Sequence, residues 1–110
     1  MSNWNRIRIY FLLTFTAIIF GCSSKQQLIN DPKIGDIYIC HDKGIYSPIM
    51  VDSVGTKLLY LFSSNYVFTD AIPTKDQILD EEFDKNFHLI YDREEIISMY
   101  SDGKIVEVYR

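Results

Sequence analysis

The chain lacks the residues from which small stapled or repetitive proteins are built. Its 110 residues include two cysteines, three prolines and five glycines. Two cysteines exclude a disulfide-dense scaffold and a four-cysteine zinc site, and so little proline and glycine excludes collagen-like and low-complexity architectures. Basic residues are also scarce, at 11 against 15 acidic ones. This balance argues against a nucleic-acid partner, because such a protein needs a basic footprint.

The rest of the composition is that of one folded domain. Hydrophobic residues make up 47% of the chain, aromatic residues 15% and charged residues 24%. A disordered chain is less apolar than this. The length suits one domain and leaves no room for a second.

The N-terminal segment has the layout of a secretion signal. Arg6 and Arg8 supply a positively charged start, residues 9–20 form an apolar run broken only by two threonines, and the first acidic residue is Asp31. A run of this length fits the apolar region of a signal peptide, about 7–15 residues, whereas a transmembrane helix needs about 20. We therefore expect residues 1–21 to be a signal peptide, the alternative being a buried core helix.

The residues around Cys22 resemble the lipobox of bacterial lipoproteins. Ile19 occupies the aliphatic position and Gly21 the small position before the cysteine, while Phe20 departs from the small or β-branched residue usual there. The resemblance implies cleavage between Gly21 and Cys22, a diacylglycerol on the Cys22 thiol and a further acyl chain on the freed amine. Several acyl chains anchor a protein much more firmly than one does. Ser23 follows the cysteine, which in the proteobacterial pattern implies delivery to the outer membrane.

Cleavage at this point would leave a more acidic chain with a short tether. Two of the 11 basic residues precede Cys22 and all 15 acidic residues follow it, so the net charge changes from −4 to −6. That charge argues against a second, electrostatic attachment to anionic lipid. We interpret Cys22 and residues 23–33 as the lipidated residue and its tether, which would reach ~36–40 Å if extended. The alternative is that Leu28 and Ile29 dock on the domain.

Residues 34–110 are typical of a small, mainly β domain. Runs of β-branched and aromatic residues bounded by turn residues predict strands at residues 36–41, 45–53, 57–63, 86–91 and 104–109. Residues 42–44 (Asp-Lys-Gly) predict a hairpin turn, because the glycine adopts a positive φ without strain. Pro48 cannot donate a ladder hydrogen bond, so the second strand should lie at a sheet edge or carry a bulge there. The third strand is apolar on both faces and should be central.

Two helices are expected in the second half of the domain. The residues from Thr74 to Gln77 match a capping box, which predicts a short helix from Lys75 to about Glu82. Asp92 begins a second helix with an apolar stripe, which should end before Gly103. This order favours an α+β fold, mainly β with minor α: a small SH3-like barrel or a curled antiparallel sheet of about five strands, with a helix before the last strand.

No pattern in the sequence specifies catalysis, a metal or a cofactor. Cys40 and His41 adjoin on a strand and therefore point to opposite faces, so they cannot share a metal ion. No serine lies in a Gly-x-Ser-x-Gly elbow, and no glycine-rich phosphate loop occurs. We interpret Cys40 as a small buried hydrophobe; a disulfide with Cys22 is the alternative if Cys22 is not acylated. We therefore expect a protein that is not an enzyme and that has no metal and no cofactor.

The acidic residues Asp80, Glu81 and Glu82 are the candidate contact surface for a basic protein partner. Tyr66 and Phe68 lie in the preceding loop and are candidate anchors, because aromatic residues are favoured at interfaces. The alternative is a solvated acidic face with buried aromatic residues. The sequence thus predicts a small lipid-anchored protein of the cell envelope with a non-catalytic binding or accessory role. The second hypothesis is an immunity-type inhibitor of an envelope-targeted toxin; a small hydrolase is a third class for which no residue constellation is found.

An intact mass tests the lipid anchor. Protein extracted from bacterial membranes should lack residues 1–21 and carry added lipid mass, whereas a Cys22→Ser variant should carry no lipid. A cleaved chain without lipid would indicate a secreted protein and would favour the disulfide between Cys22 and Cys40. An uncleaved chain without lipid would show that the signal interpretation is wrong.

Overall fold

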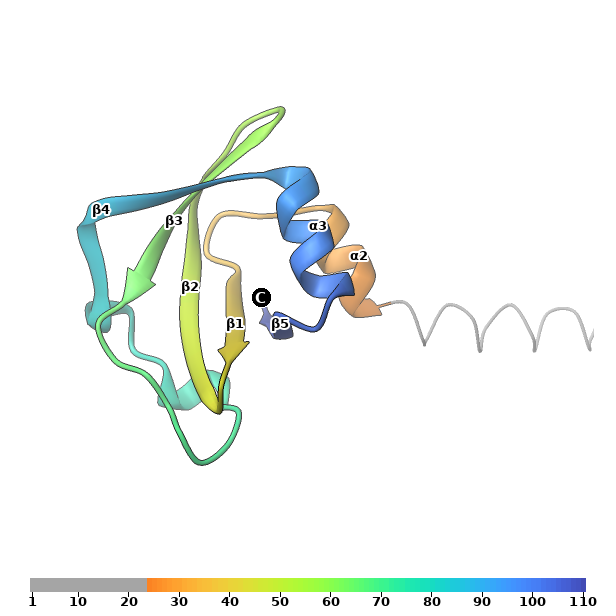
Figure 1. Cartoon of the computed structure of the whole chain (residues 1–110). Helices are drawn as coiled ribbons and strands as arrows, with labels where there is room; N and C mark the ends of the chain where they lie inside the picture. The colour runs from red at the N-terminus through yellow and green to blue at the C-terminus, as the bar shows by residue number, and fades with distance from the viewer. Residues whose placement is uncertain (1–23) are drawn as a thin grey trace, which may run out of the picture.

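The computed structural model describes residues 24–110, so the expected signal peptide and Cys22 lie outside the described residues (Figure 1). The described part is an α+β fold dominated by one sheet. Its elements are α2 (Ser24–Asn30), β1 (Ile37–Asp42), β2 (Ile45–Val54), β3 (Leu58–Ser64), the 3-10 turns η1 (Lys75–Gln77) and η2 (Asp80–Glu82), β4 (Phe83–Asp92), α3 (Arg93–Ser101) and β5 (Ile105–Tyr109).

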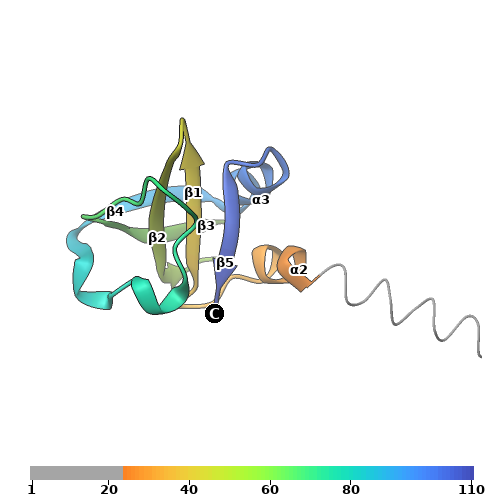
Figure 2. The ribbon, with the colours of Figure 1, turned by 90° about the horizontal axis from the view of Figure 1, so that it is seen from below.

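The strands form one antiparallel sheet of five strands in the order β4-β3-β2-β1-β5. The first four strands form a meander, and β5 returns to pair with β1 (Figure 2). The edge strands β4 and β5 do not pair with each other, so the sheet is curled and not a closed barrel. Helix α3 contacts both edge strands. The prediction of a curled sheet with a helix before the last strand is confirmed.

Local signals account for the turn between β1 and β2 and for both ends of α3. Lys43 and Gly44 have φ values of 51° and 79°, the positive pair that a tight two-residue hairpin requires. The Asp92 N–H donates to Glu95 Oε1 at 3.1 Å, and the Asp92 side chain caps the first turn of α3 in return. Gly103, with φ 78°, follows the C-terminus of the helix as expected.

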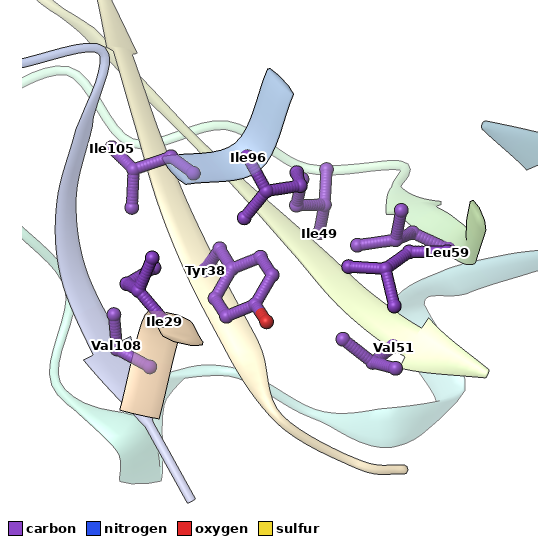
Figure 3. Packing of buried hydrophobic residues seen from close by; sticks show 9 residues of the cluster. Ile29, Tyr38, Ile49, Val51, Leu59, Ile96, Ile105 and Val108 are labelled. Carbon is purple, nitrogen blue, oxygen red and sulfur yellow. The ribbon is translucent and has the colours of Figure 1, made fainter. Parts of the chain in front are cut away.

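Side chains alternate along each strand, so both faces of the sheet carry apolar residues. Each face is covered by other elements of the chain. Helices α2 and α3 cover one face over a core that includes Tyr38 and Ile96 (Figure 3); we call it the helix-side core. The connector between β3 and β4 covers the other face. The buried residues on that face are Ile37, Ile39, Phe62, Ile78 and Phe83, which we call the loop-side core.

The segment interpreted as a tether is folded from Ser24 onward. Residues 24–30 form α2, and Ile29 is only 1% exposed within the helix-side core. The Nζ atom of Lys25 lies 3.2 Å from Glu107 Oε2 on β5, which adds a polar contact beside this apolar one. The alternative, in which Leu28 and Ile29 dock on the domain, is therefore the arrangement that forms. A floating tether would leave these apolar side chains in water, whereas docking buries them.

The expected helix from Lys75 to about Glu82 is wrong. Two 3-10 turns, η1 and η2, replace it, and Ile78 and Leu79 between them are extended. Extension places the Ile78 side chain in the loop-side core, where it is 8% exposed. Burial of this isoleucine outweighs the local helical signal, because capping contributes only about 1 kcal/mol and burial of an isoleucine about 2.

The expectation for Pro48 is also wrong, whereas that for the third strand is confirmed. β2 is the middle strand of the sheet and β3 has a neighbour on each side. Pairing between β2 and β3 begins only at Ile49, opposite Ser63. Pro48 itself is paired with Ile39 of β1. The missing N–H of the proline is tolerated because the pairing of β2 with β3 does not extend to Pro48. The bulge in β2 lies elsewhere, between Val51 and Ser53.

One buried carboxylate links the segments before β1 and after β5. Asp36 is 1% exposed, and its two oxygens accept hydrogen bonds from the Arg110 guanidinium at 2.9 Å each. The backbone N–H of Lys33 donates a third, also at 2.9 Å. Arg110 donates further to the carbonyl of Asp31 at 2.7 Å. The pKa of Arg110 is raised, chiefly by its hydrogen bond to Asp36, so the guanidinium stays charged throughout the ordinary pH range.

Two polar groups in the helix-side core lie in apolar surroundings. The Tyr38 hydroxyl is buried and finds no hydrogen-bond partner among the described residues, and burial raises its pKa. Cys40 is a free thiol whose side chain packs against the same core. Burial raises the pKa of Cys40 to about 11 from its ordinary value of 9.0. The interpretation of Cys40 as a small hydrophobe agrees with this packing, since a thiol of high pKa is a poor nucleophile.

Loss of the Arg110 guanidinium should destabilise the domain. Arg110→Ala leaves the Asp36 carboxylate buried with one backbone donor, so the free energy of unfolding should fall by about 2–4 kcal/mol. Lys85→Ala is the control, because it removes an ion pair in which both side chains are exposed and should cost less than about 1 kcal/mol. Urea denaturation measures both. If both variants lowered the free energy of unfolding by the same small amount, water would be able to replace the guanidinium beside Asp36 without loss of stability.

Cys40 should react slowly in the folded protein. In a Cys22→Ser chain it is the sole thiol, and at pH 8 the shift of its pKa lowers the thiolate fraction roughly 100-fold relative to the unfolded chain. Ellman's reagent should therefore react about 100 times more slowly without denaturant than with it. Because the pKa is higher in the folded state, the unfolded chain loses its proton first, and stability should fall as the pH rises from 9 to 11. Equal reaction rates would contradict the burial of the thiol.

Candidate functional site

The predicted contact residues gather where β3 ends and the connector begins. Ser64 pairs with Phe83, and the N–H of Asn65 donates to the carbonyl of Glu82 at 2.8 Å. Tyr66 follows Asn65 directly and is 60% exposed. The backbone hydrogen bond therefore brings the Tyr66 segment against the acidic turn η2, as the hypothesis of a combined aromatic and acidic surface requires.

Strand β4 adds a second exposed aromatic side chain at this end of the sheet. Phe62 of β3 pairs with His88 of β4, and Ser64 pairs with Phe83. The two pairs are thus two residues apart along β3 but five residues apart along β4. Residues 84–87 therefore bulge out of the ladder. Phe87, the last of them, is 61% exposed. We call the surface at this end of the sheet the acidic corner, made of Tyr66, Leu79, Asp80, Glu81, Glu82 and Phe87.

The acidic corner carries uncompensated negative charge. Asp80 Oδ2 lies 2.8 Å from Lys85 Nζ, in a pair in which both side chains are exposed. Among the described residues, no basic side chain pairs with Glu81 or Glu82. Leu79, next to Asp80, is 46% exposed. The corner thus combines exposed apolar side chains with two carboxylates available to an outside cation.

Phe68 does not belong to this surface, although the sequence groups it with Tyr66. Its backbone exchanges two hydrogen bonds with Tyr46 of β2, at 2.8 and 2.9 Å. Its side chain is half-buried and packs on the loop-side core. Phe68 therefore holds the connector against the sheet, and the prediction that it is a contact residue finds no support in its position.

A pairing that sequence reasoning missed lies on the loop-side face of the sheet. His88 Nε2 is 2.8 Å from Asp52 Oδ2, and the His88 ring stacks on Phe62 with ring centroids 4.9 Å apart. Asp52 is the extra residue of the bulge in β2, and a bulge redirects a side chain. No local signal could have found this pair, because Asp52 lies on β2 and His88 on β4, and the two meet only through the register of the sheet.

Cys40 and His41 point to opposite faces, as predicted. Cys40 packs on the helix-side core and lines an open groove of about 540 Å³ between the β1–β2 hairpin and the end of α3, together with Met99. The His41 ring stacks on Tyr46, with centroids 4.6 Å apart, and Tyr46 packs on the loop-side core. The two side chains thus pack on opposite faces, although both residues line the same groove at the end of the hairpin.

Residues 24–110 contain neither a clustered set of metal ligands nor a helix suited to cross a membrane. No group of three or more His, Cys, Asp or Glu side chains within this part of the chain is placed to hold a metal ion. None of the helices described there combines the length and the apolar character needed to cross a membrane.

Comparison of the chain with family models, with curated proteins and with solved structures finds no match.

Proposed function

We propose that this protein is a lipid-anchored lipoprotein of the cell envelope that binds a protein partner through the acidic corner and does not act as an enzyme. The observation that carries the proposal is the exposure of Tyr66 and Phe87, at 60% and 61%, at the same end of the sheet as Glu81 and Glu82, whose carboxylates pair with no basic side chain of residues 24–110.

Exposed aromatic side chains support a binding role for this end of the sheet. Single apolar residues on a surface are common and need no explanation, but neighbouring ones mark contact sites. Tyr66, Leu79 and Phe87 come from three segments that the Asn65–Glu82 hydrogen bond and the pairing of β4 bring together. Aromatic residues supply much of the binding energy at interfaces, because they bury a large area with few rotatable bonds.

The charge of the acidic corner supports a basic partner. Glu81 and Glu82 lie in the turn that the Asn65–Glu82 backbone hydrogen bond joins to the Tyr66 segment, where they would form the polar rim of an interface. Charges in such a rim chiefly raise the rate of association and select the partner. A partner with basic side chains around an apolar patch would complement both features.

The residues around Cys22 support the location. Their resemblance to a lipobox, together with Ser23 after the cysteine, favours an anchor in the outer membrane. Acyl chains on Cys22 would confine the protein to a membrane surface without any transmembrane helix.

Crosslinking from defined positions tests the partner contact. A photoreactive phenylalanine analogue replaces Tyr66 or Phe87 in the membrane-anchored protein, and replaces Ile45, which is exposed at the β1–β2 hairpin, as the control. The first two positions should yield the same adduct and Ile45 none. Mass spectrometry of the adduct names the partner, and a toxin there would select the inhibitor hypothesis.

Charge reversal then tests the acidic contribution. Glu81→Lys with Glu82→Lys should lower the adduct yield roughly tenfold, equivalent to about 1.4 kcal/mol, and high salt should lower it in the unmodified protein. Asp42→Lys with Asp102→Lys changes the net charge equally at exposed positions outside the corner and should leave the yield unchanged. The proposal fails if both double variants behave alike, or if no position yields an adduct.

A further inference from the structure

Helix α2 is held rigidly on the domain from its first turn. Ile29 lies in the helix-side core at 1% exposure, and the Lys25–Glu107 pair fixes the start of the helix to β5. At the other end of α2, the carbonyl of Asn30 accepts a hydrogen bond from Arg93 of α3 at 3.5 Å. An apolar and two polar contacts thus act on a helix of seven residues.

The anchor position predicted from the sequence lies next to this helix. Cys22 precedes Ser24, the first residue of α2, by two positions. Two residues span at most ~7 Å even when fully extended. A lipid on Cys22 would therefore be attached within ~7 Å of a helix that packs on the domain, and not at the end of an extended tether of ~36–40 Å.

We propose that the end of the domain formed by α2 and α3 rests against the lipid headgroups, and that the acidic corner is turned away from the membrane. This inference rests on the proposed function, because it requires lipid on Cys22. Both views of the molecule place α2 and α3 at one end, and η2 and the start of β4 at the other (Figures 1 and 2). The link of two residues to a rigid helix fixes which end is near the bilayer.

The lipid and the short link, and not surface charge, hold this end at the membrane. The exposed side of α3 carries Glu94 and Glu95, and the exposed Asp102 follows its last residue; anionic headgroups would repel all three. A chain without acyl groups should therefore have no affinity for vesicles. The same orientation keeps Glu81 and Glu82 away from the headgroups and leaves them accessible to a partner.

A single tryptophan reports the orientation. The only tryptophan, Trp4, precedes Cys22, so Gln27→Trp on α2 and Phe87→Trp in the acidic corner each create one probe in the mature protein. The lipidated variants are reconstituted in phosphatidylcholine vesicles that contain phosphatidylcholine spin-labelled on its headgroup. Fluorescence of the Gln27→Trp probe should be quenched severalfold more strongly than that of Phe87→Trp. Equal quenching, or stronger quenching of Phe87→Trp, would overturn the inference.

A lengthened link provides the matched control. About twelve glycine and serine residues inserted between Ser23 and Ser24 have a root-mean-square length of ~19 Å, so quenching of Gln27→Trp should fall towards the level of Phe87→Trp. Unchanged quenching would show that adhesion of the domain, and not the short link, sets the orientation.

The intact mass of each sample separates the two proposals. A sample without lipid mass on Cys22 overturns the anchor and this inference with it. A lipidated sample in which the two probes are quenched equally overturns this inference alone.

Discussion

The buried carboxylate of Asp36 is the interaction on which the arrangement of the domain depends. It lies between α2 and β1 and accepts two hydrogen bonds from Arg110, beyond the end of β5. The Arg110 carbonyl in turn accepts a hydrogen bond from Lys75 of the connector at 2.8 Å. A charge removed from water is tolerated only when it is paired and hydrogen-bonded. Three distant segments therefore meet at this point, and the pairing of Asp36 with Arg110 favours the arrangement in which they do.

This constraint explains why the two ends of the domain differ. The Asp36–Arg110 pair holds β5 beside β1, and α2 packs over β5 through Ile29 and Lys25. That end is closed by helices and by polar contacts with the chain just before β1. At the opposite end β3 stops at Ser64 and β4 bulges, so apolar and acidic side chains stay in water. The domain thus has one end covered by helices and an opposite end at which apolar and acidic side chains are exposed.

Predictions from sequence succeeded where the determining residues are neighbours. The hairpin at Lys43 and Gly44 and the α3 ends at Asp92 and Gly103 depend on hydrogen bonds and φ values within a few residues. The exposure of Tyr66 and of the acidic turn was also visible in the sequence, because polar and aromatic runs in loops are local; their role as a contact surface stays a prediction. The helix expected from Lys75 did not form, since burial of Ile78 against distant strands outweighs a local cap.

By itself the sequence determined where the strands and α3 lie, because turn residues, caps and alternating apolar positions act over short distances along the chain. Only the tertiary structure decided that α2 is part of the domain, that Pro48 lies in the middle of the sheet and that His88 meets Asp52. It also separated Phe68 from Tyr66 and added Phe87 to the same surface. These features depend on which strands are neighbours and in what register, and that choice is made by the burial of side chains from segments far apart in the chain.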